Sequence, residues 1–339
     1  MSQIVPSYDV PTVRSWRRWF ARLLVRSALP FARHTERFAV AASWKRERIS
    51  QIAEAFLTGY NAMVLSSRPI EVRPALEALP RFFRPFAYEG AAMGLGAWLW
   101  LQNLGWETFE GVMRTVNPGT LYQHYVGLGW WLDLWVRHPS RIEAIVSRLD
   151  PRYRLIVYEG IGFRRGFLRP FRPEVARNLT IFAETARHVC AQGYGRSLWF
   201  TFMDNLLGAF AWIDHMPPDI RGDCYSGIGL GAAYSMLDRF DVFENTLVSV
   251  PRADRPDFLQ GAAFGWEARQ LADRPYFDAQ LAKLPESRRQ HVTDCVRIVH
   301  SVQRQLEEDR IKTEFYQRWR KTTRALIAAQ GLFAPGDSQ

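Results

Sequence analysis

The stretch Tyr158-Glu159-Gly160-Ile161-Gly162-Phe163 decides the fold, because its pattern of an aromatic or apolar residue two places before a glycine, followed by small residues, returns along the chain. The first glycine of each copy is at Gly59, Gly90, Gly127, Gly160, Gly193, Gly227 and Gly261, with spacings of 31, 37, 33, 33, 34 and 34 residues. A period of about 34 residues is typical of paired-helix repeats. The sequence therefore predicts an all-α protein of tandem helical hairpins, arranged as a tetratricopeptide-like α-solenoid.

Prolines repeat with the same period. In four copies a proline follows the glycine by 24 residues, at Pro151, Pro217, Pro251 and Pro285. Proline cannot continue a helix, so each one marks the end of the second helix of its unit. Glycine inside a helix costs about 1 kcal/mol relative to alanine, so its recurrence indicates a place where two helices approach closely. We expect the glycines to lie in a row where successive hairpins pack together.

The composition allows one continuous helical body, since 47% of the 339 residues are hydrophobic. We divide the chain into a basic N-terminal helix and cap (1–45), a helical-repeat body (46–286), a C-terminal capping or interaction helix (287–333) and a disordered tail (334–339). Three cysteines without CxxC spacing fit a reducing compartment. The sequence shows neither a secretory signal nor a membrane-spanning window, which predicts a cytoplasmic protein.

The net charge of +10 leaves several partners open. A solvated basic surface, an anionic membrane and an acidic partner protein all remain, whereas no aromatic-basic motif favours nucleic acid. The segment from Thr12 to Leu29 predicts an amphipathic helix with Trp16, Trp19 and Phe20 opposite a set of arginines. Two interpretations stay open: peripheral contact with the inner face of the membrane, and a cap on the first repeat, which we favour because a solenoid needs one.

Two apparent ligand motifs do not hold. Gly160, Gly162 and Gly166 follow an apolar run but lack the GxGxxG spacing of a dinucleotide-binding turn. His291 and Cys295 lie four residues apart without the further ligands of a zinc site. We therefore expect no metal and no cofactor.

Polar residues inside the repeated phrase are the candidate site. Glu89 and Glu159 directly precede the glycine of their copies, and Arg196 follows that of another. Facing a concave groove, they would serve acid–base chemistry or contact a partner; the alternative, which we favour, is that the two glutamates brace helices through arginines such as Arg84, Arg164 and Arg165. The remaining candidates for the binding groove are Tyr88, Tyr122, His124, Tyr158, Trp199, Asp223, Tyr225 and Gln260.

Four phrases together resemble a bacterial family known as domain of unknown function 1702. They are Phe86-x-Tyr88-Glu89-Gly90-Ala91-x-Met93, Gly193-x-Gly195-Arg196-Ser197-Leu198-Trp199-Phe200, Ser226-Gly227-x-Gly229-Leu230-x-Ala232-x-Tyr234 and Gln260-Gly261-Ala262-Ala263-Phe264 with Ala268-Arg269. The resemblance runs from about Arg33 to about Arg304. It implies a place in gene clusters for enediyne and related polyunsaturated polyketides, often beside a larger protein with propeller-like repeats, but it carries no catalytic residues.

Two functions follow as expectations. In the first, a helical-repeat scaffold binds a partner biosynthetic enzyme or a long apolar polyene. In the second, the groove is an active site in which Glu89, Glu159 and Arg196 promote cyclisation, oxidation or halogenation of the polyene. We favour the scaffold because solenoids supply surfaces more readily than enclosed pockets.

Overall fold

The computed structural model describes residues 21–27 and 33–332, with gaps at 171, 173, 175–178 and 180. The predicted membrane-facing residues Trp16, Trp19 and Phe20 and the predicted tail at 334–339 lie outside this part of the chain. Throughout the described residues the secondary structure is helical, with no strand. The all-α prediction is confirmed, while the domain boundaries and the likeness to tetratricopeptide proteins stay predictions.

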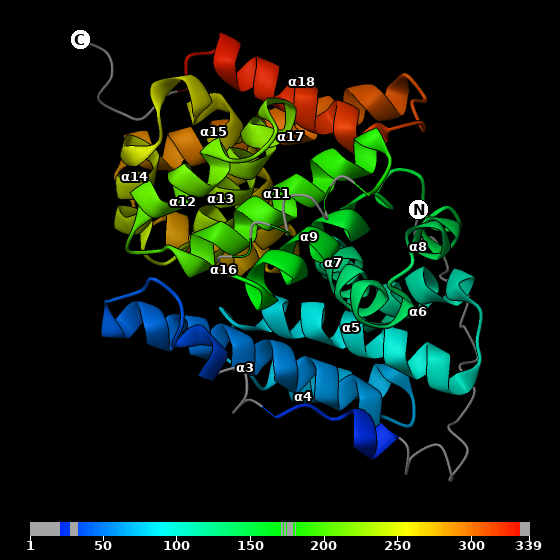
Figure 1. Ribbon diagram of the computed structural model, residues 1–339. Helices are drawn as coiled ribbons and strands as arrows, with labels where there is room; N and C mark the ends of the chain where they lie inside the picture. Colours follow the sequence, from blue (N-terminus) through cyan, green and yellow to red (C-terminus); the bar gives the residue numbers. More distant parts are fainter. Residues whose placement is uncertain are drawn as a thin grey trace.

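Long inner helices carry the repeated glycines, one copy in each. They are α3 (Ser43–Leu65), α5 (Arg84–Gln102), α7 (Leu121–Trp131), α9 (Ile156–Leu168), α11 (Glu184–Thr201), α13 (Pro218–Ser235) and α15 (Arg255–Ala272). Each inner helix packs against the next one in the order of the sequence (Figure 1). Shorter helices, which we call outer helices, lie between inner helices in the sequence: α4 (Arg73–Glu77), α6 (Phe109–Val116), α8 (Pro139–Val146), α12 (Leu206–Asp214) and α14 (Phe240–Ser249). A further short helix, α16 (Arg274–Leu281), follows α15.

The glycines lie where neighbouring inner helices touch. A Cβ atom on Gly162 of α9 would lie 1.9 Å from the carbonyl oxygen of Cys190 on α11, and one on Gly193 of α11 would lie 1.9 Å from the carbonyl oxygen of Glu159. No side chain larger than hydrogen fits at such a distance, so the backbones can approach only at glycine. Reciprocal glycine contacts also join α3 to α5, α7 to α9, α11 to α13 and α13 to α15, whereas α5 and α7 meet backbone to backbone only at Gly127, which faces the carbonyl oxygen of Glu89. The predicted row of glycine contacts is confirmed.

The row of inner helices curves until its first members reach its last. Arg48 of α3 makes a two-pronged ion pair with Asp238, which precedes α14, at 2.9 and 2.8 Å. Arg269 of α15 is buried and donates from Nη1 to the carbonyl oxygen of Phe82, just before α5, at 2.7 Å. The inner face of the row is therefore covered largely by other parts of the same chain.

The C-terminal region differs from the single capping or interaction helix expected over 287–333. It forms α17 (Glu286–Glu308) and α18 (Phe315–Ala329), separated by a turn in which Arg310 and Glu314 both have φ of 53°. α18 lies back over α15 and α17 and buries Phe315 and Trp319 completely (Figure 1). The prediction was wrong because the apolar residues of α18 are buried only if the chain reverses.

Two inner helices run through sequence that is rich in glycine or polar residues. α11 continues without a break through Cys190, Gly193 and Gly195. α13 begins at Pro218, seven residues before Tyr225. In both cases tertiary contact on the glycine face supports helix where the local sequence is rich in glycine or polar residues.

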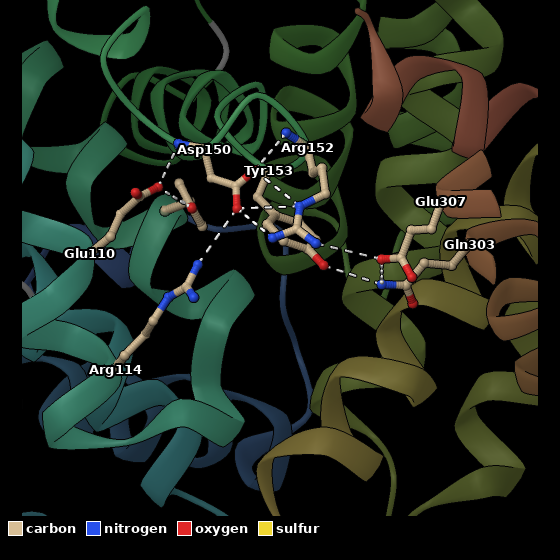
Figure 2. A network of polar contacts seen from close by, with 8 residues as sticks. Glu110, Arg114, Asp150, Arg152, Tyr153, Gln303 and Glu307 are labelled. Carbon is tan, nitrogen blue, oxygen red and sulfur yellow. Dashed lines mark hydrogen bonds and ion pairs between the residues drawn. The ribbon is translucent and has the colours of Figure 1, made fainter. Parts of the chain in front are cut away.

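A polar network fastens the C-terminal hairpin to the first half of the molecule (Figure 2). Its labelled members are Glu110, Arg114, Asp150, Arg152, Tyr153, Gln303 and Glu307. Arg152 binds Asp150 at 2.7 Å and approaches Glu307 of α17 at 3.7 Å. Burial works against charge on Asp150, but its bonds with Arg152 outweigh that effect and lower the pKa of Asp150. Asp150 therefore stays charged and holds Arg152 toward α17.

The part of the chain that the structure describes contains neither a bilayer-spanning helix nor a disulfide. Within the described residues, no helix combines the length and apolar character needed to cross a membrane. Cys190, Cys224 and Cys295 are all free and buried. Burial raises the pKa of the Cys295 thiol to about 12, so the thiol stays protonated and unreactive.

Candidate functional site

From α5 to α15, the inner helices direct two residues of each repeat toward the interior. These are the residue before the first glycine and the residue four places later, which lie on one face of a helix. On α9 they are Glu159 and Phe163, and on α11 they are Gln192 and Arg196. Among the seven copies Arg196 is the only charged residue at the second position. The repeat geometry therefore turns Arg196 toward the acidic residues of earlier repeats.

Arg196 binds both predicted glutamates at once. Its Nη2 donates to Oε2 of Glu89 on α5 at 3.0 Å, and its Nη1 donates to Oε1 of Glu159 on α9 at 3.0 Å. All three side chains are at most 4% exposed. Residues 107 positions apart in the sequence thus form one buried ion cluster, which we call the Glu–Arg–Glu cluster.

The glutamates brace helices, as one of the two interpretations held, but through a different arginine. Arg164 and Arg165 pair with Asp133 instead. Arg84 donates from Nε to the carbonyl oxygen of Leu79 at 2.8 Å. The prediction of these three arginines as partners was wrong because it relied on nearness in sequence. Arg196 comes from α11, which is one inner helix after Glu159 on α9 and three after Glu89 on α5.

The Glu–Arg–Glu cluster carries one excess negative charge. Burial raises the pKa of Glu89, and Arg196 opposes that shift only in part. Burial also disfavours charge on Arg196, but Glu89 and Glu159 outweigh it and raise the pKa of the guanidinium. Arg196 is therefore a fixed cation, and Glu89 is a carboxyl group suited to holding or releasing a proton.

A small polar cavity lies on one side of the cluster. Its volume is about 30 Å³, which is room for one or two water molecules. Beside the cluster it is lined by Tyr122, Gln123, Val126, Ile156, Leu230, Tyr234, Phe264, Ala268 and Tyr316. The Gln123 side chain donates to the Tyr234 hydroxyl at 2.8 Å, while its Oε1 is buried without a hydrogen-bond partner. The Nε of Arg196 is likewise buried without a partner, so the residues that line this cavity include one unpaired donor and one unpaired acceptor.

A second cavity of about 30 Å³ lies on the other side of Glu89 and Arg196. Its walls include the aromatic rings of Phe56, Phe86, Trp130, Phe163, Phe167 and Phe200. The aliphatic side chains of Ile49, Ile52 and Ala53 on α3 complete the wall. The Arg196 guanidinium carbon lies 4.4 Å from the centre of the Phe163 ring, a favourable cation–π contact. This aromatic cavity thus combines apolar walls with one charged end.

A polar ladder extends from the cluster along the later repeats. Gln192 donates to the Ser226 hydroxyl at 3.1 Å, and that hydroxyl donates to Oε1 of Gln260 at 2.8 Å. These residues occupy the same position before glycine as Glu89 and Glu159. The sequence analysis missed Gln192, although its position directly before Gly193 was a usable signal. No sequence signal marked Gln123, Tyr234 and Tyr316, because they reach the site only through tertiary packing.

The eight predicted groove residues do not line one groove. Tyr122 and Gln260 face the interior, where the Tyr122 hydroxyl donates to Glu267 at 3.0 Å. The tyrosines two places before glycine, Tyr88, Tyr158 and Tyr225, are buried elsewhere. The ring of Tyr225, for example, lies 5.5 Å from that of Phe210 on the outer helix α12. Adjacent helical residues point about 100° apart, so these tyrosines face the outer helices while their neighbours face inward.

The other three groove candidates make separate contacts. His124 is buried beside the Thr120 hydroxyl at 2.8 Å, and burial, aided by Arg114, lowers its pKa to about 3. His124 is therefore neutral at pH 7. Trp199 donates to the Ser235 hydroxyl at 2.8 Å, and Asp223 pairs with Arg320 at 2.7 Å.

The structure also places the two ligand-like motifs of the sequence. Residues 156–168 are helical, so no strand leads into the Gly160 turn. In the described part of the chain, no group of three histidine, cysteine or acidic residues is placed to hold a metal ion.

These observations define the class: an all-α protein whose inner helices meet at glycines and enclose a buried ion cluster between two small cavities. The chain matches the family model described as protein of unknown function (DUF1702) over residues 15–327, and it belongs to that family. Comparison with curated proteins and with solved structures finds no match.

Proposed function

We propose that the protein is an auxiliary binding subunit that holds a long apolar, unsaturated chain in its aromatic interior for a partner biosynthetic enzyme. The aromatic cavity supports this proposal, because six rings from five inner helices face one space. At about 30 Å³ that space admits only one end of such a chain, so binding the rest requires the inner helices to move apart. Aromatic faces pack well against unsaturated carbon chains, and ligand sites are usually apolar with a few polar groups. Glu89 and Arg196 would meet a polar end of the ligand. The resemblance to enediyne-cluster proteins motivates a polyene as the ligand.

The partner enzyme needs an outer surface, and one exposed aromatic pair supports such a contact. Trp100 at the end of α5 is 60% exposed and Trp135 is 44% exposed, and their rings stack at 6.3 Å. Exposed tryptophans are costly in water and frequent at the centres of protein interfaces. In this proposal the partner, such as a propeller-like repeat protein, docks over this pair and leaves the interior to the ligand.

Location is part of the same proposal. We place the complex in the cytoplasm, with attachment of residues 12–29 to the inner face of the membrane as the open alternative to a cap. Flotation of the full chain and of a chain lacking its first 30 residues with anionic vesicles tests this choice. Flotation that disappears with the deletion supports attachment, and equal behaviour of the two chains supports the cap.

Ligand binding is tested with a fluorescent conjugated polyene fatty acid added to the full chain. Ile52 is half-buried and lines the aromatic cavity. Ile52→Phe fills that cavity and is expected to weaken polyene binding about tenfold without unfolding the protein. Leu207→Phe, at a position 77% exposed on α12, is the matched control. Equal affinities of the two variants, or no binding by the unaltered chain, would refute the ligand-binding proposal.

Catalysis is the second candidate, and the buried Glu89 carboxyl favours it. A buried carboxyl with a raised pKa beside a fixed cation suits proton transfer in a cyclisation. Glu89→Gln and Glu159→Gln keep the side-chain shapes. Loss of the cyclised product with the polyene affinity preserved would support an enzymatic role for this protein. Full product formation by both variants would refute that role and leave the binding role.

A further inference from the structure

A second group of arginines surrounds a cavity of about 410 Å³ that is separate from the Glu–Arg–Glu cluster. Its lining residues are Asp133, Arg137, Arg164, Arg165, Leu168, Arg169 and Ile181. Four arginines and one aspartate give this arginine cavity a formal charge of +3. Such an excess favours an anion, because like charges in a concave site reinforce one another.

The single carboxylate serves only two of the four cations. Asp133 is buried and accepts from Arg164 Nη1 at 2.5 Å and from Arg165 at 2.7 Å. Arg137 and Arg169 are exposed at the same cavity. Arg164 also has a buried Nε with no hydrogen-bond partner. The site thus retains both positive charge and donor capacity that Asp133 does not satisfy.

The backbone beneath the cavity is irregular. Asp133 lies in a π-helical turn, η4 (Leu132–Val136), that continues α7, and Arg137 follows it with φ of 58°. π-helical turns and left-handed non-glycine residues are costly and are frequent at functional sites. Here the irregular turn places Asp133 and Arg137 beside the arginines of α9.

The electrostatics of Arg164 agree with the geometry. Burial lowers the pKa of Arg164, and the charges of Arg169 and Arg165 act in the same direction against Asp133. A bound anion would relieve this repulsion.

We propose that the arginine cavity binds the phosphate group of an organic phosphate ester. Guanidinium groups from two helical segments match phosphate oxygens that point in several directions, and arginine binds them in a forked geometry. Leu168 and Ile181 give the cavity an apolar wall for the organic part. The same phosphate chemistry is offered by a soluble ester and by an anionic phospholipid headgroup.

Calorimetric titration of the full chain with glycerol 3-phosphate at low salt, and sedimentation with phosphatidylcholine vesicles with and without phosphatidic acid, test the proposal. Binding to at least one phosphate source is expected. The double variant R137A/R169A should weaken it about tenfold or more, because both arginines lie at the cavity. The matched control is R274A/R297A, which removes two exposed arginines from α16 and α17.

The two phosphate sources give different results. Arginine-dependent binding of glycerol 3-phosphate identifies a soluble ester, and arginine-dependent binding to phosphatidic acid vesicles alone identifies a lipid headgroup. Failure to bind either source, or equal weakening in R137A/R169A and R274A/R297A, would overturn the proposal. Polyene binding is measured separately with Ile52→Phe, so the outcomes for the two sites are independent.

Discussion

Two of the arginine–carboxylate groups in this molecule form under opposite conditions. In the Glu–Arg–Glu cluster one guanidinium serves two carboxylates, and all three groups are buried. In the arginine cavity one carboxylate binds two of four arginines, and the cavity volume is about 410 Å³, compared with about 30 Å³ for each cavity beside the cluster. In the first arrangement the buried groups pair with one another and leave one formal negative charge, while the second leaves a formal charge of +3 for another molecule to neutralise. Burial and charge balance, rather than residue type, separate a structural ion cluster from a binding site.

The sharpest way to break this comparison is to remove the central cation. Arg196→Ala leaves Glu89 and Glu159 buried without their partner, and we expect a loss of about 3–5 kcal/mol in the free energy of unfolding. Urea unfolding at pH 7 measures the loss. Arg274→Ala, which removes an exposed pair with Asp278 on α16, is the control and should change stability by no more than about 0.5 kcal/mol. Equal losses would show that burial of the cluster contributes nothing.

Asp257 provides an intermediate case that sharpens the comparison. It is buried, and its partner Arg324 at 2.9 Å is half-exposed. Burial raises the pKa of Asp257 to about 6 despite Arg324. A folded-state pKa above the unfolded value means that the folded protein binds the proton more tightly, so stability from this group is present at low pH. It is lost as the pH rises from about 4 to about 6, by about 2–3 kcal/mol.

The Asp257→Asn variant should lack that loss. Urea unfolding of both proteins at pH 4 and pH 7 measures the change in the free energy of unfolding. Between pH 4 and pH 7 the variant should become more stable relative to the unaltered chain. A constant difference between the two proteins at both pH values would contradict a raised pKa for Asp257.

Removing the carboxylate of the arginine cavity should cost less than removing Arg196. Asp133→Asn leaves Arg164 and Arg165 without their acceptor, but both side chains retain some exposure to water. We expect a loss of about 1–3 kcal/mol at low salt, part of which returns when phosphate is added. Thermal unfolding with and without phosphate measures the recovery. Stability that does not respond to phosphate in this variant would argue against anion binding there.

The smallest effect is expected at the exposed rim of the same cavity. Arg137→Ala and Arg169→Ala should each change the free energy of unfolding by no more than about 0.5 kcal/mol, because both side chains are exposed and neither has a carboxylate partner within the described contacts. Urea unfolding checks this result. A loss above about 2 kcal/mol would assign these arginines to folding rather than to ligand binding.

The repeat could be predicted because glycine has a single physical role in it. The spacing of Gly160 and Gly193 predicted helical contacts, and the structure puts Gly160 against the backbone of α7 and Gly193 against the backbone of α9. The candidate site residues Glu89, Glu159 and Arg196 were also identified from their positions beside the repeated glycines. The partner assignment failed at Arg164 and Arg165, because sequence register does not specify how far the row of helices curves.

The C-terminal region shows the same limit. Periodicity from Ser287 onward predicted helix correctly but not the reversal between α17 and α18. Tyr316 and Trp319 reach earlier repeats only after that reversal; Tyr316 lines the polar cavity and the Trp319 ring lies 6.2 Å from that of Tyr122. Contacts of this kind depend on where whole helices lie in space.

The sequence by itself determined the helical class, the period and the glycine contacts, because these depend on local preference and on the absence of a Cβ atom at fixed intervals. Only the tertiary structure decided that Arg196 joins Glu89 to Glu159, that the tyrosines before the glycines face outward, and that four arginines share one cavity with Asp133. The physical reason is that charge balance and burial are properties of groups brought together from distant helices, and no local pattern records them.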